Sequence, residues 1–188
     1  MKYIDKFIEL KKTSEDYWKN ISIKKGVYGF QIQNGTKWND GLSESQLVEF
    51  QKIMGFEFPE ILKDFYTVMN GVDKEQINIY GNSSHKHSYL KKFYGFPDDV
   101  EEIKKLIKWI YEANKIDEEE MIDKNISRIF PIYHHRFILI NQKEHPVLSI
   151  YGDDIVLYAN NMIDLFYDDL EIKKTRLNYK EKINYWLD

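Results

Sequence analysis

Apolar residues recur at helical spacing in the first part of the chain and at strand-like spacing in its last third. Residues 2 to about 20 predict a helix, because apolar positions there fall three and four residues apart. Its predicted stripe consists of Tyr3, Ile4, Phe7, Ile8 and Lys11. The pair Asn34-Gly35 stands between two alternating segments, which predicts a two-residue β-hairpin. The first forty residues are therefore expected to form a helix and then a hairpin.

Residues 41–71, GLSESQLVEFQKIMGFEFPEILKDFYTVMNG, predict two consecutive helices. Ser43 is placed to cap the first helix, and Gln46 follows three residues later, as a capping box requires. Leu42 and Leu47 occupy the two positions of a hydrophobic staple around this cap. The start of the first helix is thus predicted from several side chains that support one another.

Glycine and proline predict where these two helices end and begin. Gly55 can end the first helix in the left-handed conformation, and Pro59 suits the first position of the second helix. The pair Asn70-Gly71 is expected to stop the second helix. The expected apolar stripe of that helix consists of Ile61, Leu62, Phe65, Tyr66 and Met69.

The middle of the chain predicts a strand, a long helix and an acidic surface segment. Residues 72–81 predict a strand, and Asp98 or Asp99 can cap a helix that runs to about Asn114. Residues 115–125 are strongly acidic and poor in apolar side chains, so we expect a surface loop or a short solvated helix.

From residue 129 onwards the pattern changes to short strands rich in β-branched and aromatic residues. The expected strands are RIFPIY, RFILIN, PVLSIY and DIVLYA, separated by turn residues. Asn160 or Asn161 can then cap a helix, and a last helix is expected around Ile183, Trp186 and Leu187. Because helices and strands come in blocks, the predicted class is α+β, with a mostly antiparallel sheet and about four to six helices.

Composition and charge narrow the possible classes of protein. The chain has 188 residues and neither a low-complexity linker nor an internal repeat, so we expect one domain over 1–188 with a core at about 40–170. It has no Cys, which excludes disulfides, thiolate metal sites and a cysteine nucleophile. The N-terminus lacks the apolar region of a signal peptide, and no stretch is apolar enough to span a membrane. We therefore expect a cytoplasmic protein.

A net charge of −4 argues against a general affinity for nucleic acid, which needs a basic face. The basic run at 171–182 is interleaved with Glu and is typical of a solvated helix face. The acidic run Asp117 to Glu120 could steer a basic partner or could be a solvated loop.

The ordered motifs of residues 41–71 resemble the helix pair of the SUKH superfamily, which includes fungal Smi/Knr cell-wall regulators and bacterial immunity proteins. The residues that carry the resemblance are Ser43, Gly55, Phe58, Pro59, Phe65, Asn70 and Gly71. FPIYHHRFILI at 130–140 and PVLSIYGDDIVLYANNMIDLF also look like the sheet and closing helix of one bacterial branch.

This resemblance implies a non-catalytic domain without a cofactor that binds a protein. The expected partner is a cognate intracellular toxin domain, a nuclease or another effector, neutralised by stoichiometric binding. Two alternatives remain: a scaffold or regulatory protein of the Smi/Knr type, and a small His-dependent hydrolase. The partner's identity and the oligomeric state stay open.

The candidate for a catalytic or metal-binding site is the segment His134-His135-Arg136, which lies between two apolar runs. A metal site would need these histidines with His145 and Asp153 or Asp154, but successive residues of a strand point to opposite faces. In a hydrolase, one of these histidines would act as the general base, Arg136 would bind an anionic group, and Asp153 or Asp154 would orient the histidine. No known catalytic motif links these residues.

Two further interpretations of this segment involve neither a metal nor catalysis. One histidine could pack inward while Arg136 pairs with Asp153 or Asp154, because a half-buried charge needs a partner. Alternatively, these residues form a partner-binding surface, which tyrosines favour. The candidate partner-binding residues are His134, His135, Arg136, Tyr151, Asp153, Asp154 and Tyr158.

Overall fold

A computed structural model describes residues 2–81, 87–91, 93–170 and 172–187 of the protein. The helices are α1 (Ile4–Trp18), α2 (Glu44–Met54), α3 (Glu60–Val68), α4 (Val100–Ala113), α5 (Glu118–Asp123) and α6 (Met162–Asp169). The strands are β1 (Trp38–Asp40), β2 (Met69–Val72), β3 (Gln76–Asn78), β4 (Ser88–Leu90), β5 (Ile129–Tyr133), β6 (Arg136–Leu139), β7 (Val147–Tyr151) and β8 (Asp154–Ala159). All pairings between these strands are antiparallel, which confirms the predicted α+β class.

The largest sheet has the order β5-β6-β7-β8 and is covered on both faces. One row of paired residues, Phe130, Ile138, Val147 and Ala159, lies in the first hydrophobic core. The neighbouring row contributes Phe137 and Leu148 to a second core on the other face. This explains why β5 is apolar at every position, since alternation is expected only where one face is solvated.

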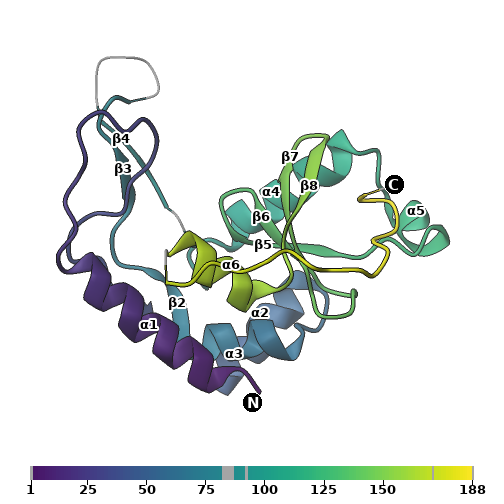
Figure 1. Ribbon diagram of the computed structural model, residues 1–188. Helices are drawn as coiled ribbons and strands as arrows, with labels where there is room; N and C mark the ends of the chain where they lie inside the picture. The colour runs from purple at the N-terminus through teal and green to yellow at the C-terminus, as the bar shows by residue number, and fades with distance from the viewer. Residues whose placement is uncertain (1, 82–86, 92, 171, 188) are drawn as a thin grey trace.

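The first core contains aromatic side chains from elements distant in sequence. Phe7 of α1 packs edge-on against Phe65 of α3, with ring centroids 5.6 Å apart, and Phe65 stacks on Phe166 of α6 at 5.4 Å. Figure 1 shows α1 running alongside α3 and α6. The buried stripe of α1 is Phe7, Leu10, Ser14 and Trp18, so the predicted stripe was partly wrong, and Ile8 is exposed.

The second core is closed by the C-terminal segment, which is not the predicted helix. Residues 172–187 form irregular structure that ends in a turn. Ile183 and Trp186 are nevertheless buried, and the Trp186 indole Nε1 donates to the Ser127 carbonyl at 2.9 Å. Leu187 is exposed. The apolar spacing therefore reflects tertiary packing of an irregular segment, and the basic run at 172–182 is not on a helix.

Most helix ends agree with the sequence pattern. The backbone N–H of Gln46 donates to the Ser43 hydroxyl, and the Ser43 N–H donates to the Gln46 side chain at 2.9 Å, which completes the capping box. Gly55 ends α2 with a φ of 78°. Asn161 caps α6, and Asp117 caps the short acidic helix α5. None of the helices in the described part of the chain is long and apolar enough to cross a membrane.

The predicted hairpin at Asn34-Gly35 is wrong, although a turn occurs there. Gly35 has a φ of 68°, and its N–H donates to the carbonyl of Trp18 at 2.8 Å. The strand that follows the turn, β1, pairs with β2 instead of with the preceding residues. The turn packs against the end of α1, because the Asn34 amide also donates to the Lys19 carbonyl.

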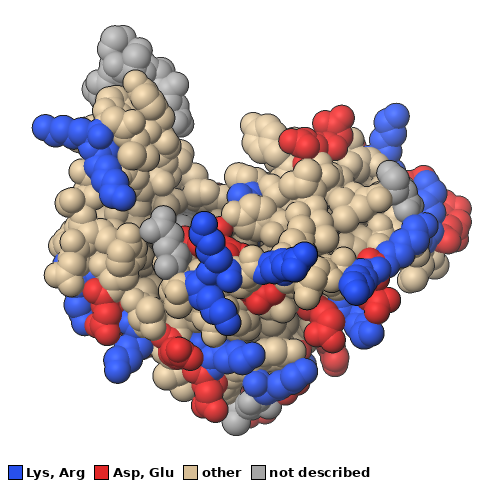
Figure 2. Space-filling view, in the orientation of Figure 1, with Lys and Arg blue, Asp and Glu red and all other residues tan. Residues whose placement is uncertain are grey.

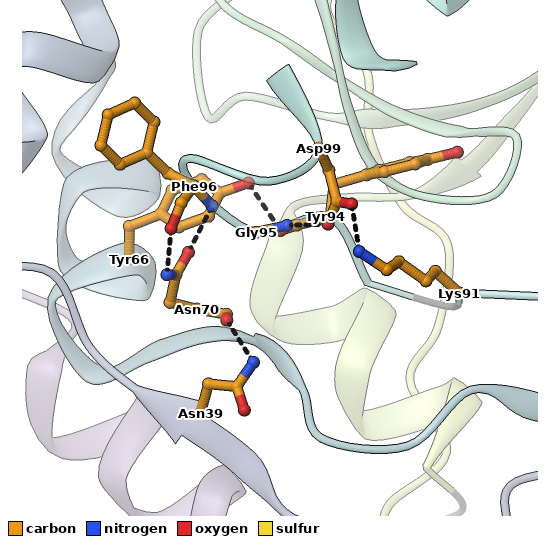
Figure 3. A network of polar contacts seen from close by, with 8 residues as sticks. All are labelled: Asn39, Tyr66, Asn70, Lys91, Tyr94, Gly95, Phe96 and Asp99. Carbon is orange, nitrogen blue, oxygen red and sulfur yellow. Dashed lines mark hydrogen bonds and ion pairs between the residues drawn. The ribbon is translucent and has the colours of Figure 1, made fainter. Parts of the chain in front are cut away.

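The pair Asn70-Gly71 does not follow a helix directly, as predicted, but lies inside strand β2. Figure 3 shows the reason. The Asn70 side-chain amide donates to the carbonyl of Phe96 at 2.7 Å and accepts from the Phe96 N–H at 2.8 Å. The Asn39 amide donates to the Asn70 carbonyl at 3.1 Å. Asn70 therefore fastens the 93–96 segment to the α3–β2 unit.

Asp99 also holds this segment, through the residue that precedes Phe96. The carboxylate accepts from the Gly95 N–H at 2.8 Å and from the Lys91 ammonium at 2.6 Å (Figure 3). The ion pair raises the pKa of Lys91. Phe93, at the start of this segment, forms a β-bridge with Tyr133 at the end of β5. The network thus positions the turn that follows β5.

A separate arm stands beside the sheet (Figure 1). It consists of β3, β4 and the loop at 20–35, which joins β3 through a bridge between Gln31 and Ile77. Figure 2 shows a deep hollow between this arm and the part of the molecule that carries β7 and β8. We call this hollow the notch.

Candidate functional site

His134 and His135 form a two-residue turn between β5 and β6, with Tyr133 paired to Arg136. The turn lies between the expected strands RIFPIY and RFILIN, so the argument that treated the two histidines as successive strand residues does not apply. His134 has a φ of 44°, the left-handed conformation that such turns use. Its ring lies edge-on to Phe30 of the arm, with centroids 6.4 Å apart. This contact places the turn against the base of the arm.

Arg136 lies flat against a tyrosine instead of pairing with an acid. Its guanidinium carbon is 3.7 Å from the centroid of the Tyr158 ring, and its Nη1 donates to the Ser149 hydroxyl at 2.8 Å. The buried Nε has no hydrogen-bond partner, and Arg136 forms no ion pair within the described residues. The predicted ion pair with Asp153 or Asp154 was wrong, because stacking replaces it.

A β-bulge brings Tyr158 to Arg136. Leu148 pairs with Leu157 and Val147 pairs with Ala159, so Tyr158 is the extra residue that opposes no residue of β7. Bulges re-aim a side chain in this way. The Tyr158 hydroxyl donates to the Asp169 carboxylate at the end of α6, at 2.7 Å. Its ring is therefore fixed at one end by Asp169 and covered by Arg136.

His135 is half-buried beside this cation. Burial lowers the pKa of His135, and the positive charge of Arg136 lowers it further. The His135 carbonyl accepts from the Ile150 N–H at 2.9 Å, which ties the turn to β7. The neutral imidazole is therefore favoured here.

Tyr151, Asp153 and Asp154 form a separate group at the tip of the β7–β8 hairpin. Tyr151 pairs with Asp154, two residue pairs beyond the level of Ser149. Tyr151 is 69% exposed, and its ring contacts the Trp109 ring edge-on, with centroids 5.4 Å apart. Both carboxylates are exposed and make no hydrogen bond to either histidine of the turn in the described structure. The candidate residues therefore fall into two groups.

The residues weighed for a metal site are not brought together. His145 lies in the turn between β6 and β7, at the opposite end of the sheet from His134 and His135, and its Nδ1 is 3.2 Å from the Leu139 carbonyl. Across residues 2–81, 87–91, 93–170 and 172–187, no group of three His, Asp or Glu side chains is placed to hold a metal ion.

Two residues of the acidic run Asp117 to Glu120, Asp117 and Glu118, line a cavity of about 460 Å³ between α4, α5 and the end of α2. Its apolar lining includes Phe56 and Tyr111, and its rim carries both acids and bases. Several of these charges lie close to one another, such as Lys108 to Glu112 at 3.7 Å. The rim therefore favours neither sign of charge in a ligand.

Sequence reasoning missed Ser149 and Phe30, which hold Arg136 and the turn. Ser149 carried a weak signal, since it is the one polar residue among the apolar ones in PVLSIY. Phe30 carried none, because its contact with the turn spans about a hundred residues of chain.

No curated protein matches this chain. The sequence pattern of the SMI1 / KNR4 family (SUKH-1) matches residues 41–168. The match extends from Gly41, before the capping box of α2, to Asp168 of α6, and it includes β5–β8 and Arg136. These residues are more than half of the chain, and the α+β fold agrees with them, so the protein belongs to the SMI1 / KNR4 family (SUKH-1).

Proposed function

We propose that the protein binds and neutralises a cognate toxin domain in the cytoplasm, as a stoichiometric immunity protein without catalytic turnover. The match to the SMI1 / KNR4 family over residues 41–168 carries this proposal. The separation of His145 from the two histidines of the turn also favours binding over metal-dependent chemistry.

We place the interface at the notch and its rims. The arm carries Tyr28 and Tyr89, whose side chains are 80% and 53% exposed, and the hairpin tip carries Tyr151. Exposed tyrosines supply large contact areas at low entropic cost, so they often dominate binding energies. Asp153 and Asp154 lie on the outer rim, while His134, His135, Arg136 and Tyr158 lie near the base of the arm. A concave surface suits a protruding element of a partner.

The test is co-expression with the effector domains encoded beside this gene, followed by calorimetry on the purified pair. We expect growth to be rescued and one toxin to bind per protein chain. Tyr151→Ala should weaken binding by about tenfold or more, as truncation of an interface anchor does. Ile122→Ala is the matched control, because Ile122 on α5 is 79% exposed and lies outside the notch.

Three outcomes would contradict the proposal. The first is the absence of binding to any neighbouring effector. The second is multiple turnover of a substrate that disappears in His135→Ala. The third is recovery of several housekeeping proteins in place of one effector, which would favour a scaffold of the Smi/Knr type.

A further inference from the structure

Arg136 uses little of its hydrogen-bonding capacity within the protein. A guanidinium carries five N–H donors and is always charged. In the described structure it makes one side-chain hydrogen bond, from Nη1 to Ser149, while Nε is buried without a partner. Nη2 makes no bond to any described residue. Arg136 is half-buried, so the donors that it does not use within the protein are left for an acceptor from outside.

The guanidinium is nevertheless held in a defined orientation. The Tyr158 ring supports its flat face at 3.7 Å, and Ser149 fixes one edge at 2.8 Å. Tyr158 is itself fixed through its hydroxyl by Asp169. The remaining N–H groups of Nη1 and Nη2 form a fork, which matches the two oxygens of a carboxylate. Little side-chain entropy would be lost on binding, because the fork is ordered beforehand.

Among the described residues, no acid supplies this carboxylate to Arg136. Asp153 and Asp154 lie at the hairpin tip, and Asp169 is engaged by the hydroxyl at the far end of the tyrosine. Figure 2 shows that the walls of the notch are formed mainly by residues other than Lys, Arg, Asp and Glu. A guanidinium beside largely uncharged walls is less screened than a cation among exposed charges, so it favours an anionic group.

We infer that Arg136, held by Tyr158 and Ser149, is a receptor for an Asp or Glu side chain that the partner protein inserts into the notch. This inference rests on the proposed function, since it names the chemistry with which the toxin is recognised. A partner residue of this kind would be an anchor at the centre of the interface, with the tyrosines on the rims around it.

The receptor can be tested without the toxin. The chain contains three arginines, Arg128, Arg136 and Arg176, so the other two are internal controls. The buried Nε of Arg136 protects its proton from exchange, which favours detection of its Nε–Hε signal by NMR. The probe is N-acetyl-glutamate N-methylamide, and the matched neutral probe is N-acetyl-glutamine N-methylamide.

We expect the acidic probe to shift the Arg136 signal saturably, with a dissociation constant on the order of 10 mM. The neutral probe should leave this signal in place. In Arg136→Lys, which keeps the charge but loses the fork, the shifts of the Ser149 and Tyr158 backbone signals should require about fivefold more probe. An absent or unsaturable shift, or equal shifts of all three arginines, would overturn the inference.

The toxin identified under the proposed function gives the second test. Arg136→Gln should weaken its binding about tenfold or more, while Arg176→Gln, on the exposed C-terminal segment, should change it less than twofold. Unchanged binding by Arg136→Gln would overturn the inference and leave the proposed function standing. A probe response without any toxin binding would refute the proposed function and support the carboxylate receptor.

Discussion

Replacing Asn70 by alanine should destabilise the fold, because its side chain holds one end of the polar network of Figure 3. The Asn70 amide satisfies both main-chain groups of Phe96, through bonds of 2.7 and 2.8 Å. Alanine removes both bonds and leaves the N–H and carbonyl of a residue that is only 6% exposed without their partner.

The magnitude follows from the number and burial of these groups. Each buried polar group left unsatisfied costs about 1–3 kcal/mol. Asn70 is half-buried, so water would partly replace the amide, and the expected loss is about 2–4 kcal/mol of unfolding free energy. This is a large share of the roughly 5–15 kcal/mol that stabilises a typical domain. For a chain of this size, Tm should fall by about 5–15 °C.

The assay is urea denaturation followed by tryptophan fluorescence, since Trp18 and Trp38 are buried in the first core. The control is Asn39→Ala in the same network. Asn39 is exposed and makes one bond, at 3.1 Å, so its loss should cost less than about 1 kcal/mol. A loss below about 1 kcal/mol for Asn70→Ala, or equal losses for the two variants, would refute the structural role assigned to Asn70.

Further predictions concern a close backbone approach, a cap and a histidine. Gly41→Ala would place a Cβ atom 1.8 Å from the Thr67 carbonyl oxygen and should lower the free energy of unfolding by about 3 kcal/mol or more. In Gly55→Ala the new Cβ meets open space, so only the left-handed φ is unfavourable and the loss should be about 1 kcal/mol. Equal Tm values for the two variants would contradict this expectation. Ser43→Ala removes the cap of α2 and should lower the free energy of unfolding, measured by urea denaturation, by about 1 kcal/mol. An unchanged urea midpoint would argue against the cap. Folding lowers the pKa of the His135 side chain from 6.5. As the pH falls, the imidazole is therefore protonated in the unfolded chain before it is protonated in the folded protein. The stability of the fold should consequently decrease as the pH drops below about 6.5. His135→Gln should flatten that slope, and a slope identical to wild type would count against the pKa shift.

Sequence reasoning succeeded where structure depends on neighbouring residues. The capping box of Ser43 and Gln46 and the left-handed Gly55 are local, so a short window contained the whole signal. It failed where distant packing decides. At Asn34-Gly35 the turn forms, but β1 takes β2 as its partner. Near the C-terminus, the helical spacing of Ile183 and Trp186 arises because both side chains fill the second core without a helix.

The same limit applies to the site. The sequence places two histidines next to Arg136, but it contains no indication that Tyr158 would lie on the guanidinium. That contact depends on the register of β6, β7 and β8 and on the bulge opposite Val147 and Leu148. One residue of shift in a strand turns every side chain to the other face, so the predicted pairing of Arg136 with Asp153 or Asp154 could not be tested without the register.

Helix α1 and the C-terminal segment determine whether the family-matched residues 41–168 can form a stable fold without the rest of the chain. Phe7 and Trp18 precede residues 41–168, and Ile183 and Trp186 follow them, yet these four side chains fill cores on opposite faces of the sheet. A fragment trimmed to 41–168 would expose apolar surface on both faces, and we expect it to aggregate and to bind hydrophobic dyes. Any relative with different ends must cover these two faces with other residues. Grafting the notch onto another protein would therefore require transfer of the ends as well as the matched segment.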